Sequence, residues 1–331
     1  MSHGWTRREF FKGALGGILA ACGASFPRCT RTDWRADTFI GKVADYERDI
    51  ASVIISGLKE LRVGPEEIRG KRILLKPNLI EPHVGANHIN THPKVVRAAI
   101  EAFFRCGASK VLVAEGPGHC RDSMRVLEES GLGDVLLEDR IPFVDLNYEQ
   151  GVLVRNLGGR TRLSSITLPD MLQQVDWIVS VAKMKTHHWA GVTLSMKNLF
   201  GLMPGIYYGW PKNVFHWEGI DNSIFDINAT VRPHFAIIDG IVGMEGDGPI
   251  MGSPRHAGVL ILGRNLTAVD ATGARIMGID PYKIFHLKTA SNLLGPIRES
   301  HIQQKGEKIA TVRTDFLLID KIDAQRGLRL T

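Results

Sequence analysis

The feature that most constrains the fold is an alternation of short apolar runs with segments of helical periodicity, beginning near residue 46. Apolar residues recur at helical spacing in 46–61 and 91–106, and Thr91 before Pro93 is typical of a helix N-cap. Short apolar runs at 73–75, 111–114 and 177–181 predict buried strands. Strands alternating with helices favour the α/β class, with a mostly parallel sheet and helices on both faces.

Two stretches depart from this alternation. Residues 152–154 and 162–168 flank Gly158-Gly159, which predicts an inserted β-hairpin. Residues 207–217 gather five aromatic side chains around Gly209 and Pro211, which favours a loop rather than a helix. Such a loop would either cover a small-molecule pocket or pack as core.

The first 21 residues have the layout of an export signal. Arg7-Arg8 precede Phe10-Phe11-Lys12 and an apolar run over 13–21, which resembles a twin-arginine signal. Residues 19–22, Leu-Ala-Ala-Cys, resemble a lipobox in which Cys22 is lipidated. The alternative is a plain amphipathic N-terminal helix.

This interpretation sets the expected organisation and location. Residues 1–21 would be the signal peptide, 22–40 a tether, and 41–331 one α/β domain with up to two lobes. The twin-arginine translocase would be a partner. A lipid anchor at Cys22 would hold the protein in a membrane, in the periplasm or on the outer face of the cytoplasmic membrane.

The charge balance gives no reason to propose nucleic acid. The sequence has 41 basic and 35 acidic residues, a formal charge of +6. Loss of residues 1–21 removes three basic residues and one acidic residue, which lowers the charge to +4. No long run of like charge remains, so a phosphate-backbone surface is not expected.

The cysteines also restrict the possibilities. Four cysteines in 331 residues are too few for a disulfide scaffold. Cys106 precedes a predicted strand and Cys120 follows its far end, so a bond between them is not expected. With Cys22 lipidated, three cysteines remain, too few for an all-cysteine iron–sulfur cluster.

Polar side chains follow the predicted strands, where ligands bind in parallel sheets. They are Lys76, Asn78, Glu115, Lys183, Lys185, His187, His188 and Asp239. A helix predicted over 191–200 would add Lys197 and Asn198 and turn its N-terminus toward an anion. The alternative is a partly buried helix whose lysines extend to solvent.

These residues suggest roles. Lys76, Lys185 and Lys197 would hold an anion, with Asn78, Lys183 and Asn198 as further substrate-binding residues. His187 or His188 would transfer protons, because histidine titrates near neutral pH, and Lys197 would be catalytic with them. Carboxylates could also supply oxygen ligands for a hard metal ion such as magnesium or calcium. The candidates are Glu115, Asp239, Glu245, Asp247 and Asp270.

Four motifs in order resemble one family. Leu75–Leu79 reads Leu-Lys-Pro-Asn-Leu, and 183–187 with 192–201 form the second motif. The third is 239–249 and the fourth is 268–271 with 277–280. Together they resemble the uncharacterised domain-of-unknown-function family 362 over about residues 38–290. Many members carry an iron–sulfur module, but this chain has no cysteine cluster, so no such cluster is expected.

A second resemblance is to the nickel-pincer lactate racemases. The motif of that family can be aligned with His187, Gly191, Lys197 and Pro204-Gly205 of this chain. The resemblance implies that His187 is a base and that Lys197 carries the pincer cofactor. Ser195-Met196 stand where that family has a glycine pair.

The combined expectation is an exported enzyme that acts on a small anionic molecule by lysine binding and histidine acid/base chemistry. Two alternatives remain at this point. One is a non-catalytic lipoprotein that binds a ligand or metal. The other is a nickel-pincer racemase-like enzyme.

Overall fold

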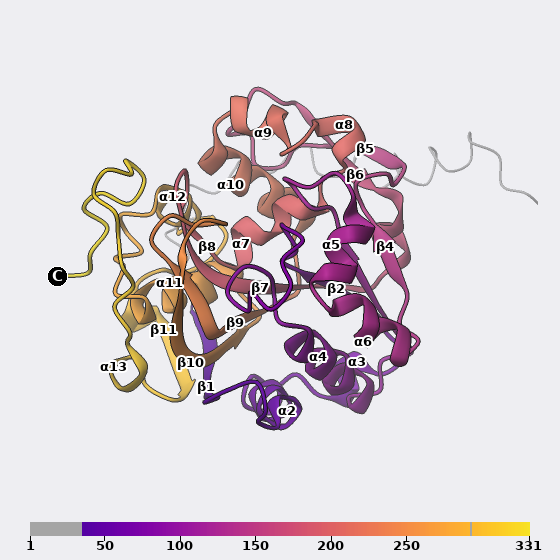
Figure 1. Cartoon of the computed structure of the whole chain (residues 1–331), viewed down its shortest axis with the longest axis horizontal. Coiled ribbons are helices and arrows are strands. Elements are labelled where there is room, and N and C mark those ends of the chain that lie inside the picture. The colour runs from indigo at the N-terminus through magenta and orange to yellow at the C-terminus, as the bar shows by residue number, and fades with distance from the viewer. Residues whose placement is uncertain (1–34, 292) are drawn as a thin grey trace, which may run out of the picture. The chain divides into compact units, whose positions relative to one another are not determined.

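A nine-stranded sheet forms the centre of the chain (Figure 1). The computed structural model describes residues 35–291 and 293–331, so the expected signal peptide, Cys22 and the tether up to residue 34 lie outside it. The strands run in the order β11-β1-β10-β9-β7-β2-β3-β4, and β8 pairs with β7. Their bounds are β1 (Ala36–Lys42), β2 (Arg72–Pro77), β3 (Lys110–Glu115), β4 (Phe143–Asp145), β7 (Trp177–His187), β8 (Gly191–Thr193), β9 (Phe235–Glu245), β10 (Ser253–Gly263) and β11 (Ile302–Gly306).

Most neighbouring strands of this sheet are parallel. The pairs β2–β3, β2–β7, β3–β4, β7–β9 and β1–β11 are parallel. The pairs β1–β10, β10–β9 and β7–β8 are antiparallel. The predicted α/β class with a mostly parallel sheet is therefore confirmed.

Helices cover both faces of the sheet, as predicted. Neighbouring strand residues point to opposite faces, so Ile73 and Leu75 join one hydrophobic cluster and Leu74 joins the other. The first cluster packs α2, α4, α5 and α6, and the second packs α7, α10, α11 and α12. The helices are α2 (Ile50–Glu60), α3 (Pro65–Ile68), α4 (Pro93–Arg105), α5 (Ser123–Glu129), α6 (Leu132–Glu138), α7 (Ser195–Asn198), α8 (Gly205–Tyr208), α9 (Asn213–Trp217), α10 (Ile220–Val231), α11 (Leu266–Ile276), α12 (Phe285–Ala290) and α13 (Ile309–Val312).

The predicted hairpin is confirmed, as a separate two-stranded sheet of β5 (Gly151–Arg155) and β6 (Ser165–Pro169). Its connecting loop wraps around the buried carboxylate of Asp226 on α10. That carboxylate accepts hydrogen bonds from the backbone N–H groups of Arg160 and Thr161 and from the Asn156 side chain. The hairpin is thereby fixed to the helix layer.

Two expected boundaries are wrong. Residues 36–40 belong to β1 rather than to the tether, because they pair with β11 on one side and β10 on the other. The N-cap of α4 is His92, whose Nδ1 accepts the N–H of Lys94. Thr91 instead accepts the N–H of Asn78 and donates to the carbonyl of Val181, which ties the loop after β2 to β7.

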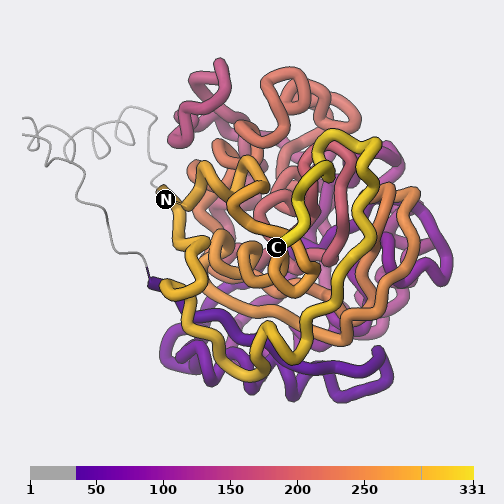
Figure 2. The backbone as a smooth tube through the Cα atoms, turned by 90° about the vertical axis from the view of Figure 1, so that its left-hand side faces the viewer, coloured from indigo at the N-terminus to yellow at the C-terminus, as the bar shows by residue number. Residues whose placement is uncertain are grey.

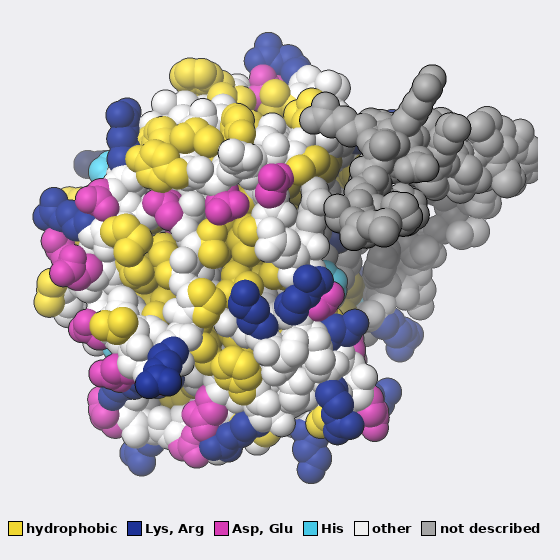
Figure 3. Space-filling view, turned by 90° about the vertical axis from the view of Figure 1, so that its right-hand side faces the viewer, with side chains coloured by type: hydrophobic (Ala, Val, Ile, Leu, Met, Phe, Trp, Pro, Cys, Tyr) yellow, Lys and Arg dark blue, Asp and Glu magenta, His cyan; other side chains and the backbone are white. Residues whose placement is uncertain are grey.

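The C-terminal segment, yellow in Figure 2, runs over the outside of the molecule. The N–H of Phe316 donates to Met277, that of Gly246 to Leu317, and that of Leu330 to Gly278. Residues after α13 are thus tied to β9 and to the end of α11. On the face shown in Figure 3, hydrophobic side chains gather in the upper and central parts, and basic and acidic side chains lie among and below them.

Candidate functional site

A pocket lies at the carboxyl ends of β2 and β3, beside the end of β7. Its volume is about 160 Å³, roughly ten times the space that one buried water needs. Its polar lining comes from β2, β3, β7, β8, α7 and α9 and from loops beside them. These residues are Lys76, Asn78, Glu115, His119, His187, His188, Thr193, Lys197, Asn198, Lys212 and His216.

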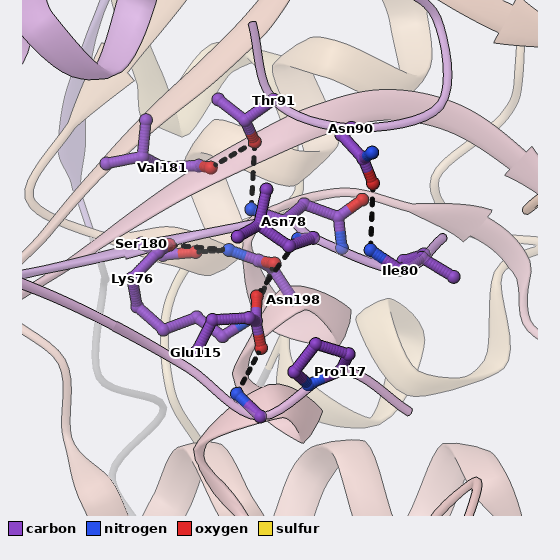
Figure 4. A network of polar contacts seen from close by, with 12 residues as sticks. Lys76, Asn78, Ile80, Asn90, Thr91, Glu115, Pro117, Ser180, Val181 and Asn198 are labelled. Carbon is purple, nitrogen blue, oxygen red and sulfur yellow. Dashed lines mark hydrogen bonds and ion pairs between the residues drawn. The ribbon is translucent and has the colours of Figure 1, made fainter. Parts of the chain in front are cut away.

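The floor of the pocket holds a buried ion pair (Figure 4). Lys76 Nζ lies 2.6 Å from Glu115 Oε2, and each side chain is 1% exposed. Glu115 also accepts the N–H groups of Leu79 and Gly116, at 3.1 and 2.9 Å. Burial lowers the pKa of Lys76 and raises that of Glu115, while their mutual attraction opposes both shifts. Lys76 was expected to hold a substrate anion, but Glu115 already neutralises it.

Asn198 connects α7 to the sheet. Its Oδ1 accepts from Lys76 Nζ at 2.9 Å, and its Nδ2 donates to the Lys76 carbonyl and to Ser180 Oγ, both at 3.0 Å (Figure 4). The amide is therefore fully engaged within the protein. Its position supports a role in placing α7, in addition to the expected place in the pocket wall.

Lys197 is a cation without a carboxylate partner among the described residues. Its Nζ lies 4.0 Å from the centre of the Phe200 ring. Burial, and then the positive charge of Lys76, lower the pKa of Lys197 to about 7. The amine is therefore partly neutral at physiological pH.

Asp270 on α11 holds the helical turn that carries Lys197. The carboxylate accepts the N–H of Ser195 at 2.8 Å and that of Met196 at 2.9 Å. Asp270 is fully buried, and burial raises its pKa to about 6. It thus caps α7, and it does not face the pocket as a metal ligand.

Lys212 is a third lysine of the pocket, which the sequence interpretation missed. Its side chain is 1% exposed, and its Nζ donates to Asn147 Oδ1. Burial lowers the pKa of Lys212 to about 7. Its backbone has φ of 68°, before α9. The segment around it was expected to be a loop, but it folds into α8 and α9, with Lys212 and His216 turned to the pocket.

Two histidines present opposite hydrogen-bonding groups. His187 Nδ1 accepts the N–H groups of Trp189 and Ala190, at 3.0 and 3.2 Å, so its hydrogen is on Nε2. His216 Nδ1 lies 3.1 Å from the carbonyl oxygen of Lys212 and must donate to it, so its Nε2 has a free lone pair.

Both imidazoles are neutral near pH 7. Burial lowers the pKa of His187 well below 6.5, and nearby Lys197 lowers it further. Burial, with the charge of Lys197, lowers the pKa of His216 to about 4. His187 can therefore donate a hydrogen bond and His216 can accept one.

His188 is the more exposed of the two histidines named from the sequence. Its Nδ1 lies 3.9 Å from Asp247 Oδ1, beyond hydrogen-bond distance. Burial lowers its pKa, and Asp247 opposes that shift. It lines the pocket next to Trp189.

Two buried oxygen atoms of the wall have no hydrogen-bond partner. They are Asn78 Oδ1 and Thr193 Oγ1, on side chains that are 6% and 3% exposed. Buried polar atoms are rarely left unpaired, since this costs roughly 1–3 kcal/mol each. Both line the pocket, so a polar ligand there would complete their bonding.

Lys183 and Lys185 lie outside the pocket lining, contrary to expectation. The strand predicted over 177–181 continues to His187, so both lysines stand within β7. Lys183 pairs with Asp239 at 2.7 Å and bonds Tyr46. Lys185 donates to the carbonyls of Ile89 and Pro249, at 2.8 and 3.3 Å.

The expected helix over 191–200 is also wrong. Gly191–Thr193 is β8, paired antiparallel with β7, and the helix is only the single turn α7. So short a helix supplies no appreciable macrodipole, and positive charge in the pocket comes from lysines instead.

The carboxylates proposed for a metal lie in separate environments. Glu115 pairs with Lys76, Asp239 pairs with Lys183, and Glu245 accepts the N–H of Leu317. Across residues 35–291 and 293–331, no group of three or more His, Cys, Asp or Glu side chains is arranged to hold a metal ion. Cys106 and Cys120 are both free thiols.

Fold and pocket together define an α/β protein with a lysine- and histidine-lined site at the carboxyl edge of its parallel strands. The chain belongs to the family described as Domain of unknown function (DUF362), whose model matches residues 73–275. It is 29% identical over 221 residues to the "Thylakoid-associated protein sll1697" of Synechocystis. That match covers 65% of each chain, less than two thirds of the relative's length.

Two solved structures show limited similarity. One is a protein from Thermotoga maritima, at 15% identity and a TM-score of 0.37, covering 65% of this chain and 56% of that chain. The other is the lactate racemase apoprotein from Thermoanaerobacterium thermosaccharolyticum, at 14% identity and a TM-score of 0.35, covering 68% and 54%. Among the described helices, none has the length and apolar character needed to cross a bilayer.

Proposed function

We propose that the chain is an enzyme acting on a small anionic molecule in the pocket that contains Lys197 and Lys212. The observation that carries this proposal is the charge of the pocket. Lys76 and Glu115 neutralise each other, whereas Lys197 and Lys212 have no carboxylate partner among the described residues. A bound anion would favour their charged forms and offset the desolvation that lowers their pKa values.

The histidines support chemistry in addition to binding. His187 Nε2–H would stabilise an oxygen on which negative charge develops, as preorganised donors do. His216 Nε2, with its free lone pair, would accept a proton, and His188 at the mouth would exchange protons with solvent. The role of acid or base, first assigned to His187 or His188, is here proposed for His188 and His216.

Calorimetric titration of the full chain with acetate, pyruvate, malonate and inorganic phosphate tests the anion site. At least one of these should bind, and Lys197→Met and Lys212→Met should each weaken it about ten-fold or more, since a hydrogen bond to a charged group contributes roughly 1.5–3 kcal/mol. Lys42→Met, at an exposed lysine of β1, is the matched control. Absence of binding, or unchanged affinity in both pocket variants, would exclude this site.

The competing function is a lipoprotein that binds its ligand without turning it over. A binding lipoprotein would use the same pocket, so the two functions are distinguished by whether the bound ligand is converted to a product. A stoichiometric ligand recovered unchanged from the purified protein would favour binding alone, and chemical conversion would favour the enzyme.

We also propose export and lipid anchoring at Cys22. The twin-arginine and lipobox motifs support this, and the name of the Synechocystis relative supports membrane association. Cys22→Ser should release the protein from the membrane fraction into the soluble fraction. Retention of that variant in the membrane would contradict the anchor.

A further inference from the structure

We propose that Lys197 forms an imine with the carbonyl carbon of a small oxo acid, a molecule with a ketone or aldehyde next to a carboxylate. This inference rests on the proposed function and names its substrate class. It also assigns Lys197 a covalent role, and it leaves the carboxylate of the substrate to Lys212.

The environment of Lys197 is that of a nucleophilic amine. Its Nζ lies against the Phe200 ring and has no hydrogen-bond or ion-pair partner among the described residues. By contrast, Lys76 is bonded to Glu115 and Asn198, and Lys212 to Asn147. An amine must be neutral to attack a carbonyl carbon, and desolvation beside another cation favours the neutral form. Lys197 satisfies both conditions.

The remaining pocket groups match the rest of such a substrate. Lys212 lines the same pocket and has N–H groups left for a carboxylate after its bond to Asn147. The carbonyl oxygen needs a donor, which His187 Nε2–H supplies. A proton acceptor is needed when nitrogen loses its hydrogens, and His216 Nε2 has the free lone pair.

The step balances without an oxidant or reductant. The Lys197 lone pair forms the C–N bond while the carbonyl π electrons move to oxygen; nitrogen then loses one proton and oxygen gains one, which gives the neutral carbinolamine. The carbinolamine hydroxyl takes a second proton and leaves as water while the nitrogen lone pair forms the C=N bond of the iminium ion, and loss of its last N–H proton gives the imine. Amine and carbonyl give imine and water, and uptake of one proton gives the iminium ion.

Reductive trapping tests the proposal directly. The full chain is incubated at pH 7 with pyruvate and cyanoborohydride, which reduces an iminium to a stable secondary amine, and the adduct is located by peptide mass mapping. We expect one stoichiometric adduct on Lys197, with Lys76 and Lys212 unmodified. Lys197→Arg should abolish it, and Lys42→Arg, at an exposed lysine, should leave the yield unchanged.

The peptide map of the wild-type protein tests the imine at Lys197 even if a variant folds poorly, because it needs no substitution. No adduct on Lys197, or an adduct spread over surface lysines, would overturn the proposal. So would a Lys197 that already carries another group in protein purified from its own membrane, as a pincer cofactor requires.

Propionate, which lacks the carbonyl, separates this inference from the proposed function. Propionate binding without a pyruvate adduct would overturn the imine and leave the anion site standing. An adduct on Lys197 that forms equally well with acetaldehyde, together with no propionate binding, would support imine formation at Lys197 but overturn both the oxo-acid substrate and the anion site.

Discussion

Lys76 Nζ and Glu115 Oε2 stand 2.6 Å apart on neighbouring parallel strands, and solvent reaches neither side chain appreciably. This pair supports the floor of the pocket, since Asn198 and the turn after β3 are bonded to it. Removing one member of a buried ion pair leaves the other charge uncompensated.

Glu115→Gln should therefore lower the free energy of unfolding by about 3–5 kcal/mol, because Lys76 loses its partner in a buried site. Chemical denaturation measures the change. Glu47→Gln is a matched control, because Glu47 forms an exposed ion pair with Lys94 at 2.7 Å and should change stability by less than about 1 kcal/mol. Equal effects of the two substitutions would contradict a structural role for the Lys76–Glu115 pair.

Gly201 is expected to tolerate no side chain. A Cβ there would overlap Glu115 Oε1 and the end of Lys76. Gly201→Ala should destabilise the chain by about 1–3 kcal/mol through overpacking and should also weaken anion binding. Gly64→Ala, where a Cβ meets nothing within 4 Å, is the control and should leave binding intact. If Gly201→Ala kept the stability and the anion affinity of the wild type, the Lys76–Glu115 pair would be able to move aside for a side chain, which would contradict its fixed position.

Asp270 positions Lys197 through the cap of α7. Asp270→Asn replaces one carboxylate oxygen with a donor that faces backbone N–H groups. Loss of these bonds should cost about 1–3 kcal/mol and reduce the yield of the Lys197 adduct several-fold. Lys197 trapping with pyruvate measures the positioning effect at a temperature where the variant stays folded. An unchanged adduct yield in folded Asp270→Asn would contradict this role.

The reactivity of Lys197 should depend on pH with a midpoint near 7. Charged and titratable groups act on it from several elements: Lys76, Lys185, Glu115, His187, His188, His216 and Asp221. Because burial lowers its pKa to about 7, the neutral amine increases as pH rises from 6 to 8. Acetylation of Lys197, quantified by peptide mass spectrometry, should rise over this interval. A pH midpoint near 10 for the acetylation of Lys197 would contradict a lowered pKa at this amine.

The lowered pKa of Lys197 also has a cost in stability. Between pH 7 and its ordinary value of 10.5, the unfolded chain binds this proton more readily than the folded chain does. This group therefore destabilises the fold increasingly as pH falls through that interval.

Sequence periodicity predicted the layers of the fold well, because the alternation of 73–75 and 111–114 with helices leaves few other topologies. It failed where pairing comes from distant segments. Residues 36–40 form a strand because residues 302–306 and β10 lie beside them. Asp37 and Thr38 interrupt the apolar run that would otherwise have predicted a buried strand.

Within the site, sequence position identified Lys76, His187 and Lys197 as pocket residues but could not assign their partners. The pairing of Lys76 with Glu115 depends on the register of two strands. Lys212 and His216 were not named as site residues, although the aromatic segment that carries them was expected either to cover a pocket or to pack as core; the segment was interpreted as a loop, so the side chains that α8 and α9 turn to the pocket could not be assigned. Lys183 and Lys185 were misplaced because β7 extends six residues beyond its predicted end at residue 181.

The most direct test of the central claim is proton uptake when an anion enters the pocket. Calorimetric titration with pyruvate, repeated in two buffers of different ionisation enthalpy, measures the number of protons bound. Because burial lowers the pKa values of Lys197 and Lys212 to about 7, binding at pH 8 should take up between one and two protons, and uptake should fall at pH 6, where both amines are more fully charged before binding. Binding without uptake at pH 8, or no binding at either pH, would contradict the account.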